Sequence, residues 1–408
     1  MCGIAGMFDT RDRRDIPRDI VGRMNDVQFH RGPDGGDIHF EPGVALAHRR
    51  LAIIDVGGGH QPLFNEDGSV VVVFNGEIYN FQELVPELEA LGHTFRTHSD
   101  TEVIVHAWEA WGEACVERFR GMFAFVLWDR NRQTLFVARD RLGVKPFFYA
   151  LLPDGMFVFG SELKALMQHP QMPRTIEPQC VEEYFALGYV PEPRTIYRGV
   201  MKLDAGHTLT LRRGEPFPAS REYWDVRFTL DAKISAADAE AELTARLRES
   251  VRLRMIAEVP LGAFLSGGVD SSAVVAMMAE SSSSPVKTCS IGFDDPKFNE
   301  TEFASQVAQR YRTDHQIETV ASDDFGLIDQ LARLYDEPYA DSSAIPTWRV
   351  CEIARRRVTV ALSGDGGDET FGGYSRYRRH LAEERLRGLF PSALRRGLFG
   401  PLAQIYPK

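Results

Sequence analysis

The chain has 408 residues, of which 44% are hydrophobic and 26% are charged, a composition typical of a soluble globular protein. This length exceeds what one ordinary hydrophobic core supports, so we expect two domains. The net charge of −11 argues against non-specific binding to nucleic acid or to an anionic membrane, and we expect neither as a partner.

The start of the chain and its cysteine pattern are informative about the cellular compartment. No apolar run approaches the length of a membrane span, and charged residues between Asp9 and Asp15 stand where a signal peptide needs an apolar stretch. The 5 cysteines are odd in number and form no Cys-x-x-Cys pair, so they indicate neither a disulfide framework nor a zinc site. We therefore expect a cytoplasmic protein.

Short apolar runs bounded by glycine, proline or charge predict a sheet-rich α/β layer in the first two hundred residues. The predicted strands are Val44–Ala47, Leu51–Ile54, Val70–Phe74, Phe123–Leu127 and Leu135–Ala138. Proline and glycine are frequent at 191–193 and 214–218, and we place the boundary shortly after. The first domain is predicted to span residues 1–215 and the second residues 230–408.

Beyond the boundary, strands and helices alternate, which predicts a parallel, doubly wound sheet with ligands at the carboxyl ends of its strands. Ser235 is a good N-cap for a helix that carries Leu243, Leu247, Val251 and Met255 on one ridge. The predicted strands are Leu261–Leu265, Val286–Phe293, Ile317–Val320 and Val358–Leu362. Two helices are predicted at Ala273–Glu280 and Asp324–Leu334. A third helix is predicted to begin at a capping box, Asn299–Glu302, and to end at Tyr311.

The first four residues, Met1-Cys2-Gly3-Ile4, predict a catalytic nucleophile. A small residue at position 2 normally lets the initiator methionine be removed, which leaves Cys2 at the mature N-terminus. Cys2 then carries a thiol and an α-amino group, whose ordinary pKa is about 7.7–8.0. That amine can take the thiol proton and return it to a leaving amine without a histidine. The tetrapeptide alone is equally compatible with an ordinary small residue.

Two glycine-containing turns are predicted at one edge of the parallel sheet. In Ser266–Ser272, the glycines let the backbone approach a phosphate, and the following helix presents unpaired N–H groups. This turn lacks the Gly-Lys-Ser/Thr of a Walker A loop and has the shape expected of a PP-loop, which holds the pyrophosphate of ATP; the alternative is a bare turn. In Leu362–Glu369, crowded acidic groups imply Mg²⁺, and the alternative is a solvated loop.

A possible oxyanion hole follows the strand Val70–Phe74. Asn75-Gly76 is ordinarily a hairpin signal, but the next residues have helical spacing, so the partner strand is missing. A strand-end turn with a free amide and an exposed N–H would stabilise an oxyanion. Arg50 is a candidate for a bidentate clamp on an α-carboxylate, and Glu77 and Asp100 could hold an α-ammonium group. Taken singly, such residues are more often surface ion pairs or solvated carboxylates.

Together, these residues resemble the glutamine-hydrolysing asparagine synthetases, in which a class II (N-terminal nucleophile) glutamine amidotransferase is fused to an ATP-pyrophosphatase domain. The resemblance covers essentially the whole chain. The motifs that carry it are Met-Cys-Gly-Ile at the start, Arg31–Asp34, Asn75–Asn80, Gly121–Phe125, Arg139–Gly143, Ser266–Ser272 and Ser363–Tyr374. It implies an α/β fold with an N-terminal αββα Ntn-hydrolase sandwich and a C-terminal doubly wound PP-loop domain of the adenine nucleotide alpha hydrolase-like type.

The resemblance also implies roles at the matching positions. Cys2 would attack the glutamine amide, and Asn75 and Gly76 would stabilise the oxyanion. Arg50, Asn75, Gly76, Glu77 and Asp100 would bind glutamine. ATP would be bound by Leu265, Ser266, Gly267, Gly268, Asp270, Ser271, Ser272, Ile291, Ser363 and Gly364, and Mg²⁺ by Asp270 and Asp368. A homodimer would be usual for the family.

The chain departs from the family pattern at two places. Family members often carry Glu where this chain has Asp365, a position tied to forming the acyl-adenylate. The side chain of Asp365 is therefore one methylene shorter than the usual glutamate. They also continue with an Arg-x-Pro-Phe-Leu-Asp segment and a lysine that contacts pyrophosphate, and neither follows Tyr374 here. We therefore expect that a chain ending at Gln404–Lys408 is truncated and that its second half-reaction is weakened or lost.

The implied reaction is the glutamine-dependent conversion of aspartate to asparagine in asparagine biosynthesis, with ATP cleaved to AMP and pyrophosphate. Free ammonia in water is mostly ammonium, so we predict an apolar-lined tunnel from Cys2 to Ser266–Ser272. Two alternatives stay open. One is amidation of another carboxylate in an exopolysaccharide or exosortase-associated pathway. The other is a fragment that acts only as a glutaminase or a nucleotide binder.

Overall fold

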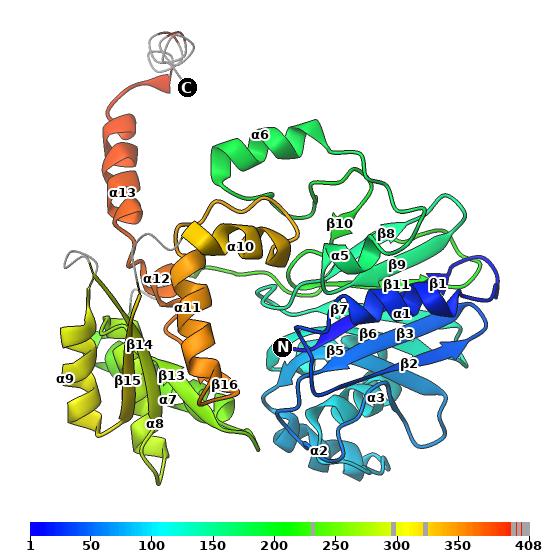
Figure 1. The fold of residues 1–408 in the computed structure, drawn as a ribbon, viewed down its shortest axis with the longest axis horizontal. Coiled ribbons are helices and arrows are strands. Elements are labelled where there is room, and N and C mark those ends of the chain that lie inside the picture. Colours follow the sequence, from blue (N-terminus) through cyan, green and yellow to red (C-terminus); the bar gives the residue numbers. More distant parts are fainter. Residues whose placement is uncertain (230–232, 295–298, 321–324, 393–396, 398–400, 402–408) are drawn as a thin grey trace.

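The computed structural model describes the whole chain except residues 230–232, 295–298, 321–324, 393–396, 398–400 and 402–408 (Figure 1). The described strands of the first half form two six-stranded sheets, in the orders β10-β8-β9-β1-β3-β2 and β12-β11-β7-β6-β5-β4. Neighbouring strands of both sheets pair antiparallel. The sheet-rich first half is therefore confirmed.

The elements of the first half have the following bounds. The first sheet contains β1 (Gly3–Asp9), β2 (Gly35–Glu41), β3 (Val44–Arg50), β8 (Phe148–Leu151), β9 (Met156–Gly160) and β10 (Met201–Lys202). The second contains β4 (Leu63–Phe64), β5 (Val70–Ile78), β6 (Gly121–Asp129), β7 (Thr134–Arg139), β11 (His207–Arg212) and β12 (Arg221–Glu222). The helices are α1 (Arg18–Asp26), α2 (Phe81–Ala90), α3 (Asp100–Trp111), η1 (Gly112–Ala114), α4 (Cys115–Arg118), α5 (Leu163–Leu166) and α6 (Pro178–Leu187).

Three apolar clusters arrange these elements in layers. Because side chains of a strand alternate between its faces, Val71 and Val73 of β5 meet Phe8 of β1 between the two sheets. The outer face of the second sheet packs on α2 and α3 through Val72 and its neighbours, and the outer face of the first sheet packs on α1 and α5 through residues such as Met7. This order of helix, sheet, sheet and helix confirms the predicted αββα sandwich (Figure 1).

The second half contains the predicted parallel sheet. Its strands β13 (Leu261–Phe264), β14 (Lys287–Phe293), β15 (Asp314–Val320) and β16 (Val360–Leu362) have the order β15-β14-β13-β16 and pair in parallel. The helices are α7 (Ala236–Arg254), α8 (Val269–Ser281), α9 (Thr301–Tyr311), η2 (Phe325–Leu327), α10 (Ile328–Leu334), α11 (Ala344–Arg355), α12 (Gly367–Phe371) and α13 (Ser375–Gly388).

Helices cover both faces of this sheet. Ala263 of β13 belongs to an apolar cluster with α7, α8 and α9, whereas its neighbour Phe264 packs with Ala354 of α11 on the other face. The doubly wound arrangement is therefore confirmed. The predicted cap is present too, because the Ser235 side chain accepts a hydrogen bond from the Asp238 N–H at the start of α7.

Two predicted elements of the first half are wrong. Leu51–Ile54 is not a strand: β3 ends at Arg50, and the following residues form a loop. Asn75-Gly76 is not a strand-end turn, because β5 continues to Ile78 and pairs with β6. The partner strand that local sequence lacked comes from more than forty residues further along the chain (Gly76 pairs with Phe123).

Boundaries in the second half also differ from the prediction. The helix expected at Ala273–Glu280 begins at Val269, so Asp270, Ser271 and Ser272 lie in its first turns. The start of the helix predicted at Asp324–Leu334 lies outside the described residues, and η2 and α10 occupy the part that is described. β12 continues the second sheet to Glu222, beyond residue 215. The domain limits of 1–215 and 230–408 stay predictions.

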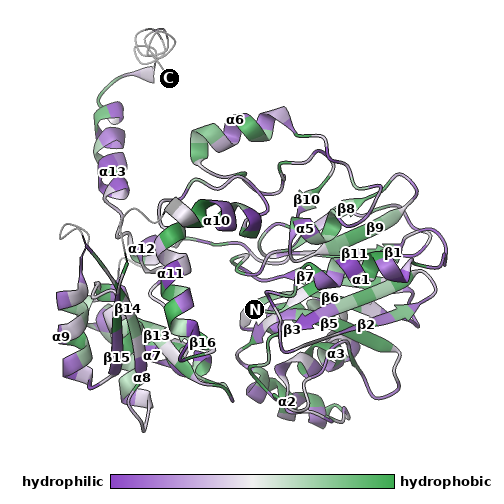
Figure 2. Cartoon of the chain, viewed as in Figure 1, coloured by the Kyte–Doolittle hydropathy of each residue, from purple (hydrophilic) through white to green (hydrophobic). Residues whose placement is uncertain are grey.

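The parallel sheet lies beside the sandwich, with β16 as the sheet edge nearest to it, whereas α13 extends away from both (Figure 1). None of the helices in the described ranges is long and apolar enough to cross a membrane. α13 has no buried residue and is largely hydrophilic (Figure 2).

Candidate functional site

The residues predicted to process glutamine line one cavity of about 290 Å³. Its lining includes Cys2, Arg50, Asn75-Gly76-Glu77 and Asp100. They come from the start of the chain, the end of β3, the second half of β5 and the first residue of α3. The fold thus brings together every predicted residue of the glutamine site.

Cys2 lies immediately before β1 and is held by backbone contacts. Its Sγ accepts a hydrogen bond from the Leu51 N–H at 3.4 Å, and the Arg31 Nε donates to its carbonyl at 2.9 Å. Burial raises the pKa of the Cys2 thiol. A thiol that stays protonated needs a base next to it in order to become a nucleophile.

The N-terminal amine has the properties of such a base. In the chain with Met1 attached, burial and the nearby charges of Arg31 and Lys145 lower the pKa of this amine to about 5. An amine with a lowered pKa is neutral at pH 7 and can accept a proton. This amine belongs to Met1; after removal of Met1, the base would be the amine of Cys2 itself.

The residues predicted to form an oxyanion hole lie within strand β5 and not in a turn at its end. Asn75 is only 1% exposed, and neither its side-chain nitrogen nor its oxygen has a partner in the described part of the chain. A buried carboxamide without partners is costly unless a ligand satisfies it. Asn75 lines the cavity, so that ligand would be the substrate.

The direction of the Gly76 N–H follows from its neighbours on β5. The N–H groups of Phe74 and Ile78 both point away from β6, because they donate to Gln61 Oε1 at 2.7 Å and Asp100 Oδ2 at 2.9 Å. Since N–H directions alternate along a strand, the Gly76 N–H points to the same open edge. Position 76 itself has no room for a side chain, because a Cβ on Gly76 would lie 2.2 Å from the Met122 carbonyl oxygen of β6.

Besides Lys145, the charged groups that line the cavity are Arg50 and two carboxyl groups. The guanidinium of Arg50 is anchored by carbonyl oxygens, including that of Val56 at 3.0 Å. Burial raises the pKa of Asp100 to about 6. Burial and the charge of Asp100 raise the pKa of Glu77 to about 7. Two buried carboxyl groups side by side favour a bound cation, and an α-ammonium group is one.

Among the cavity residues that sequence reasoning missed are Lys145 and Gln61. Lys145 is 4% exposed, and burial lowers its pKa. Asp140 shapes its loop by accepting from the Val144 N–H at 2.9 Å and the Lys145 N–H at 3.0 Å. The sequence did hold a signal for Lys145, because the family motif Arg139–Gly143 ends two residues before this lysine. Gln61 had no sequence signal.

An ion-pair chain links Cys2 to the second half of the chain. Arg31, which binds the Cys2 carbonyl, lies 3.1 Å from Glu162. Lys164 lies 3.3 Å from Glu162 and 3.2 Å from Asp336, which follows α10. Burial would raise the pKa of Glu162, but His30 and these cations hold it at about 2. A series of ion pairs therefore joins the segment after α10 to Arg31, which holds the backbone of Cys2.

The second half also contacts the glutamine cavity directly. Thr359, Val360 and Ala361, around the start of β16, line it. Glu258 accepts hydrogen bonds from the N–H groups of Asp55 and Val56, both at 3.0 Å. This is the loop whose carbonyl groups hold Arg50, so Glu258 supports the predicted carboxylate clamp from the other half of the chain.

The predicted ATP residues lie at the carboxyl ends of β13, β14 and β16. Leu265 continues from β13, and its N–H donates to the Cys289 carbonyl of β14 at 3.0 Å. Ile291 lies two residues further along β14. Ser266 and Ser271 hydrogen-bond to each other at 2.9 Å, and the Gly268 N–H donates to Ser266 Oγ at 3.2 Å. These serines therefore shape the loop from within.

The two predicted turns touch each other. A Cβ on Gly364 would lie 2.7 Å from the Ser271 nitrogen, and one on Gly367 would lie 2.5–2.8 Å from the carboxylate atoms of Asp270. Only glycine permits this approach. Both turns precede helices, α8 and α12, and the longer helix α8 directs its N-terminus at the site.

The acidic groups of the second turn point in different directions. Asp365 accepts from Ser363 Oγ at 2.9 Å, and Glu369 accepts from the Tyr374 hydroxyl at 2.6 Å. Asp368 lies against Gly373, where a Cβ would be 1.8 Å from its Oδ1. Within the described ranges, Asp270 and Asp368 are not part of a group of three or more potential metal ligands. The Mg²⁺ site stays a proposal.

The fold and the cavity at Cys2 define an N-terminal-nucleophile type of amidotransferase joined to a parallel-sheet domain. Residues 1–224 match the glutamine amidotransferase domain family, and residues 242–404 match the asparagine synthase family. The chain is 38% identical to the Methanocaldococcus jannaschii putative asparagine synthetase [glutamine-hydrolyzing] 2, over 97% of this chain and 79% of the relative. The chain therefore belongs to the glutamine-hydrolysing asparagine synthetase family.

A second relative is longer. The chain is 36% identical to Bacillus subtilis asparagine synthetase [glutamine-hydrolyzing] 1, over 98% of this chain and 62% of that protein. The chain thus spans less than two thirds of the length of this curated relative. Among solved structures, the B. subtilis glutamine phosphoribosylpyrophosphate amidotransferase complexed with ADP and GMP is 15% identical, with a TM-score of 0.42 over 83% of this chain and 94% of that chain.

Proposed function

We propose that this chain converts aspartate to asparagine with glutamine as the nitrogen source and cleaves ATP to AMP and pyrophosphate. The observation that supports this most is the cavity that gathers Cys2, the unpartnered Asn75 side chain and the Arg50–Glu77–Asp100 end, with β16 in its wall. The family to which the chain belongs supports the choice of aspartate and ATP.

The first half-reaction uses the residues around Cys2. Its α-amine takes the thiol proton, and the sulfur attacks the glutamine amide carbon. The Asn75 side chain and the Gly76 N–H stabilise the resulting oxyanion. The amine then returns the proton to the leaving nitrogen, which departs as ammonia, and water hydrolyses the thioester.

The second half-reaction uses the two turns of the parallel sheet. Ser266–Ser272 would hold the pyrophosphate of ATP at the N-terminus of α8, while Leu265, Ile291, Ser363 and Gly364 frame the nucleotide. The aspartate carboxylate attacks the α-phosphate and releases pyrophosphate, and ammonia then displaces AMP from the acyl-adenylate. Asp365 stands at the position tied to forming that adenylate. Mg²⁺, held by Asp270 and Asp368, would neutralise phosphate charge.

We propose that ammonia travels along β16. This strand lines the Cys2 cavity at Val360 and Ala361 and ends two residues before Gly364 of the nucleotide turn. An apolar route would keep ammonia unprotonated, since its conjugate acid resembles lysine in pKa. Replacing Ala361 by a bulky residue should uncouple glutamine hydrolysis from AMP formation; unchanged stoichiometry would argue against this route.

The decisive experiment measures AMP release with glutamine and ATP. We expect AMP only when aspartate is present, with asparagine formed in equal amount. AMP release with a different carboxylic acid and not with aspartate would contradict the proposal that aspartate is the acceptor. We further propose a cytoplasmic homodimer acting on these small molecules; the five cysteines are all free, which suits a reducing compartment.

Glutamine affinity should depend on pH through Glu77 and Asp100. Their pKa values are raised to about 7 and about 6, so both lose their negative charge as the pH falls through that range. Only the ionised forms attract an α-ammonium group, so KM for glutamine should rise from pH ~8 to pH ~5.5. A KM measured by glutamate release that stays constant over this interval would contradict the assignment.

Glu258 should support glutamine binding without taking part in the chemistry. Glu258→Ala removes two hydrogen bonds from the loop that anchors Arg50, so we expect KM for glutamine to rise about threefold to tenfold with kcat nearly unchanged. Glu242→Ala is the matched control, because Glu242 is another exposed glutamate and pairs only locally, with Arg246 of the same helix. An equal change in both variants would refute the coupling.

A further inference from the structure

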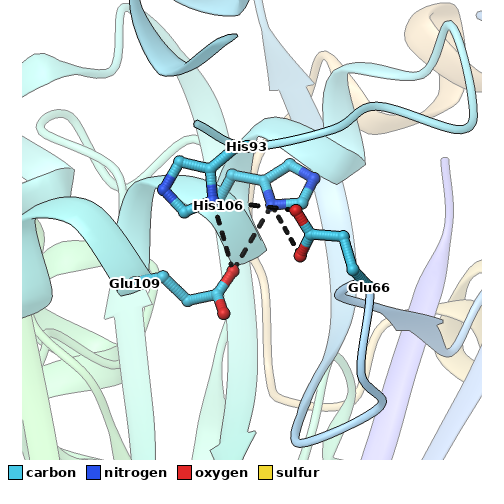
Figure 3. Close-up of side chains that lie close together, drawn as sticks. All are labelled: Glu66, His93, His106 and Glu109. Atoms are coloured by element: carbon cyan, nitrogen blue, oxygen red, sulfur yellow. Dashed lines mark hydrogen bonds and ion pairs between the residues drawn. The ribbon is translucent and has the colours of Figure 1, made fainter. Parts of the chain in front are cut away.

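Four potential metal ligands lie together outside the site described above. They are Glu66 after β4, His93 after α2, and His106 and Glu109 on α3 (Figure 3). Each offers one ligand atom, and these atoms all lie within 4.8 Å of one another. His106 and Glu109 are three residues apart and share one face of the helix.

The spacing of these atoms is compatible with a metal ion among them, although the shortest contact, between His106 and Glu109, is also within hydrogen-bonding distance. His106 Nδ1 lies 3.4 Å from Glu109 and 3.6 Å from Glu66. His93 Nδ1 lies 3.7 Å from the same oxygen of Glu109 and 3.8 Å from the other oxygen of Glu66. Tetrahedral zinc with bonds of about 2.0–2.1 Å places its ligand atoms about 3.4 Å apart. The direct contact between His30 and Glu162 is shorter, at 2.9 Å.

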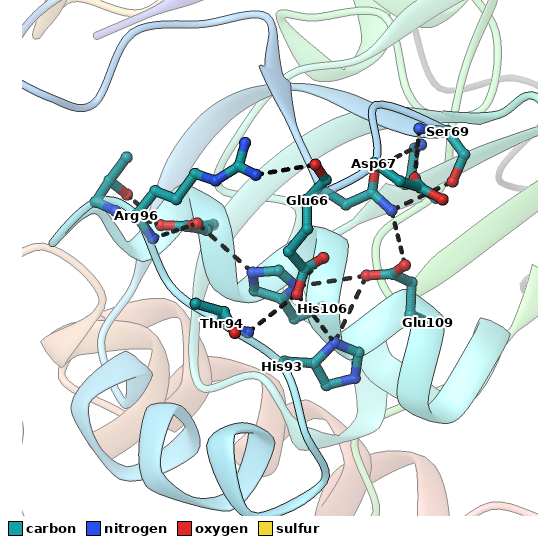
Figure 4. Close-up of polar contacts among 12 residues, drawn as sticks. Glu66, Asp67, Ser69, His93, Thr94, Arg96, His106 and Glu109 are labelled. Atoms are coloured by element: carbon teal, nitrogen blue, oxygen red, sulfur yellow. Dashed lines mark hydrogen bonds and ion pairs between the residues drawn. The ribbon is translucent and has the colours of Figure 1, made fainter.

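The surroundings of the cluster orient its ligands as a metal site requires (Figure 4). The other ring nitrogen of His106 lies 3.5 Å from Glu102, which leaves Nδ1 directed at the cluster. Asn65 donates to the second oxygen of Glu109 at 2.7 Å, and the Thr94 N–H donates to Glu66 at 3.0 Å. Carboxylate–histidine pairs and hydrogen-bonded carboxylates are the usual support of zinc ligands.

From this geometry we propose that Glu66, His93, His106 and Glu109 bind one Zn²⁺ in a closed structural site. Two carboxylates and two neutral imidazoles balance the charge of the ion, and four protein ligands complete its tetrahedron. No cysteine takes part, which is why the cysteine pattern indicated no zinc. The ion would join two loops to α3, whose first residue is Asp100 of the glutamine cavity.

The test uses the full chain, stripped with a chelator and titrated with ZnCl₂ by calorimetry. We expect about one high-affinity Zn²⁺ per chain, and at least about 100-fold weaker binding in His93→Gln, since even supporting residues contribute 10–100-fold. Zn²⁺ should also raise the melting temperature of the wild-type chain but not of this variant. His93 is in a loop, and circular dichroism verifies that the variant folds.

His39→Gln is the matched control, because His39 is a similarly shielded histidine that lies 3.3 Å from Glu41 on β2. It should bind Zn²⁺ as the wild type does. Co²⁺ should give a tetrahedral visible spectrum without a thiolate charge-transfer band, which separates this site from free cysteines. No tight binding by the wild-type chain, or equal binding by His93→Gln, would overturn the proposal and leave an ion-pair cluster only.

Discussion

Cys2→Ala should abolish glutamine-dependent asparagine synthesis and glutamine hydrolysis while leaving ammonia-dependent synthesis in place. The thiol is the only nucleophile among the cavity residues that the proposed mechanism uses, so its loss should cost about 10³-fold or more in glutaminase kcat. Ammonium salts supply the nitrogen directly and need only the parallel-sheet site. The measurement is glutamate release and AMP release by the same preparation, with glutamine or with ammonium chloride.

Cys180→Ala is the control for this experiment, because Cys180 is fully buried in α6, outside the cavity. It should retain both activities. Mass spectrometry of the wild-type chain should show that Met1 has been removed. Glutamine hydrolysis by material that keeps Met1, or by Cys2→Ala, would contradict the role of the Cys2 sulfur and amine. Loss of the ammonia reaction in every variant would instead indicate an inactive synthetase half.

Asn75→Ala should lower glutaminase kcat by about 10²–10³-fold, the usual effect of losing one oxyanion donor, with little change in KM. The Asn75 carboxamide has no partner within the described residues, so its hydrogen bonds are available to the transition state. Asn75→Asp keeps the shape and places a negative charge beside the oxyanion, so its effect should be at least as large. The assay is steady-state glutamate release.

Asn25→Ala is the matched control, because Asn25 is 4% exposed on α1 and its Oδ1 also has no partner in the described part of the chain. Truncating it removes a buried amide of the same kind away from the cavity, so kcat should be unchanged. Ammonia-dependent synthesis should be normal in all three variants. A drop in that reaction would point to a general effect on folding and against an oxyanion role for Asn75.

The candidate residues of both sites could be named from the sequence because they stand in short segments, and their chemistry stays a prediction. Cys2 needs only its own thiol and amine, and the turn Ser266–Ser272 needs only glycines between a strand and a helix. The parallel sheet was predictable from the alternation of apolar strands and helices, and the cap at Ser235 from its local hydrogen bond. The structure contains the parallel sheet and the cap, but the helix after the turn begins four residues earlier than predicted, at Val269.

The failures have a common cause in contacts between distant segments. Leu51–Ile54 is apolar enough for a strand, but its backbone is used elsewhere: Leu51 binds the Cys2 sulfur, and the Ile53 carbonyl accepts from Glu258 at 2.9 Å. Asn75-Gly76 carries a turn signal, yet pairing with β6 keeps it extended. Tertiary pairing overrides a local preference of about 1 kcal/mol or less.

By itself, the sequence determined the family motifs, and from them it predicted the nucleophile, the residues that would recognise glutamine and the phosphate-binding turn, because each motif consists of a few neighbouring residues. The tertiary structure decided what those residues face. It supplied Lys145 and Gln61 to the cavity and turned the Gly76 N–H to the open edge of β5. It also placed β16 in the cavity wall and Glu258 against the loop that anchors Arg50. These arrangements come from strand pairing and from contacts between the two halves of the chain, and no local pattern of residues records them.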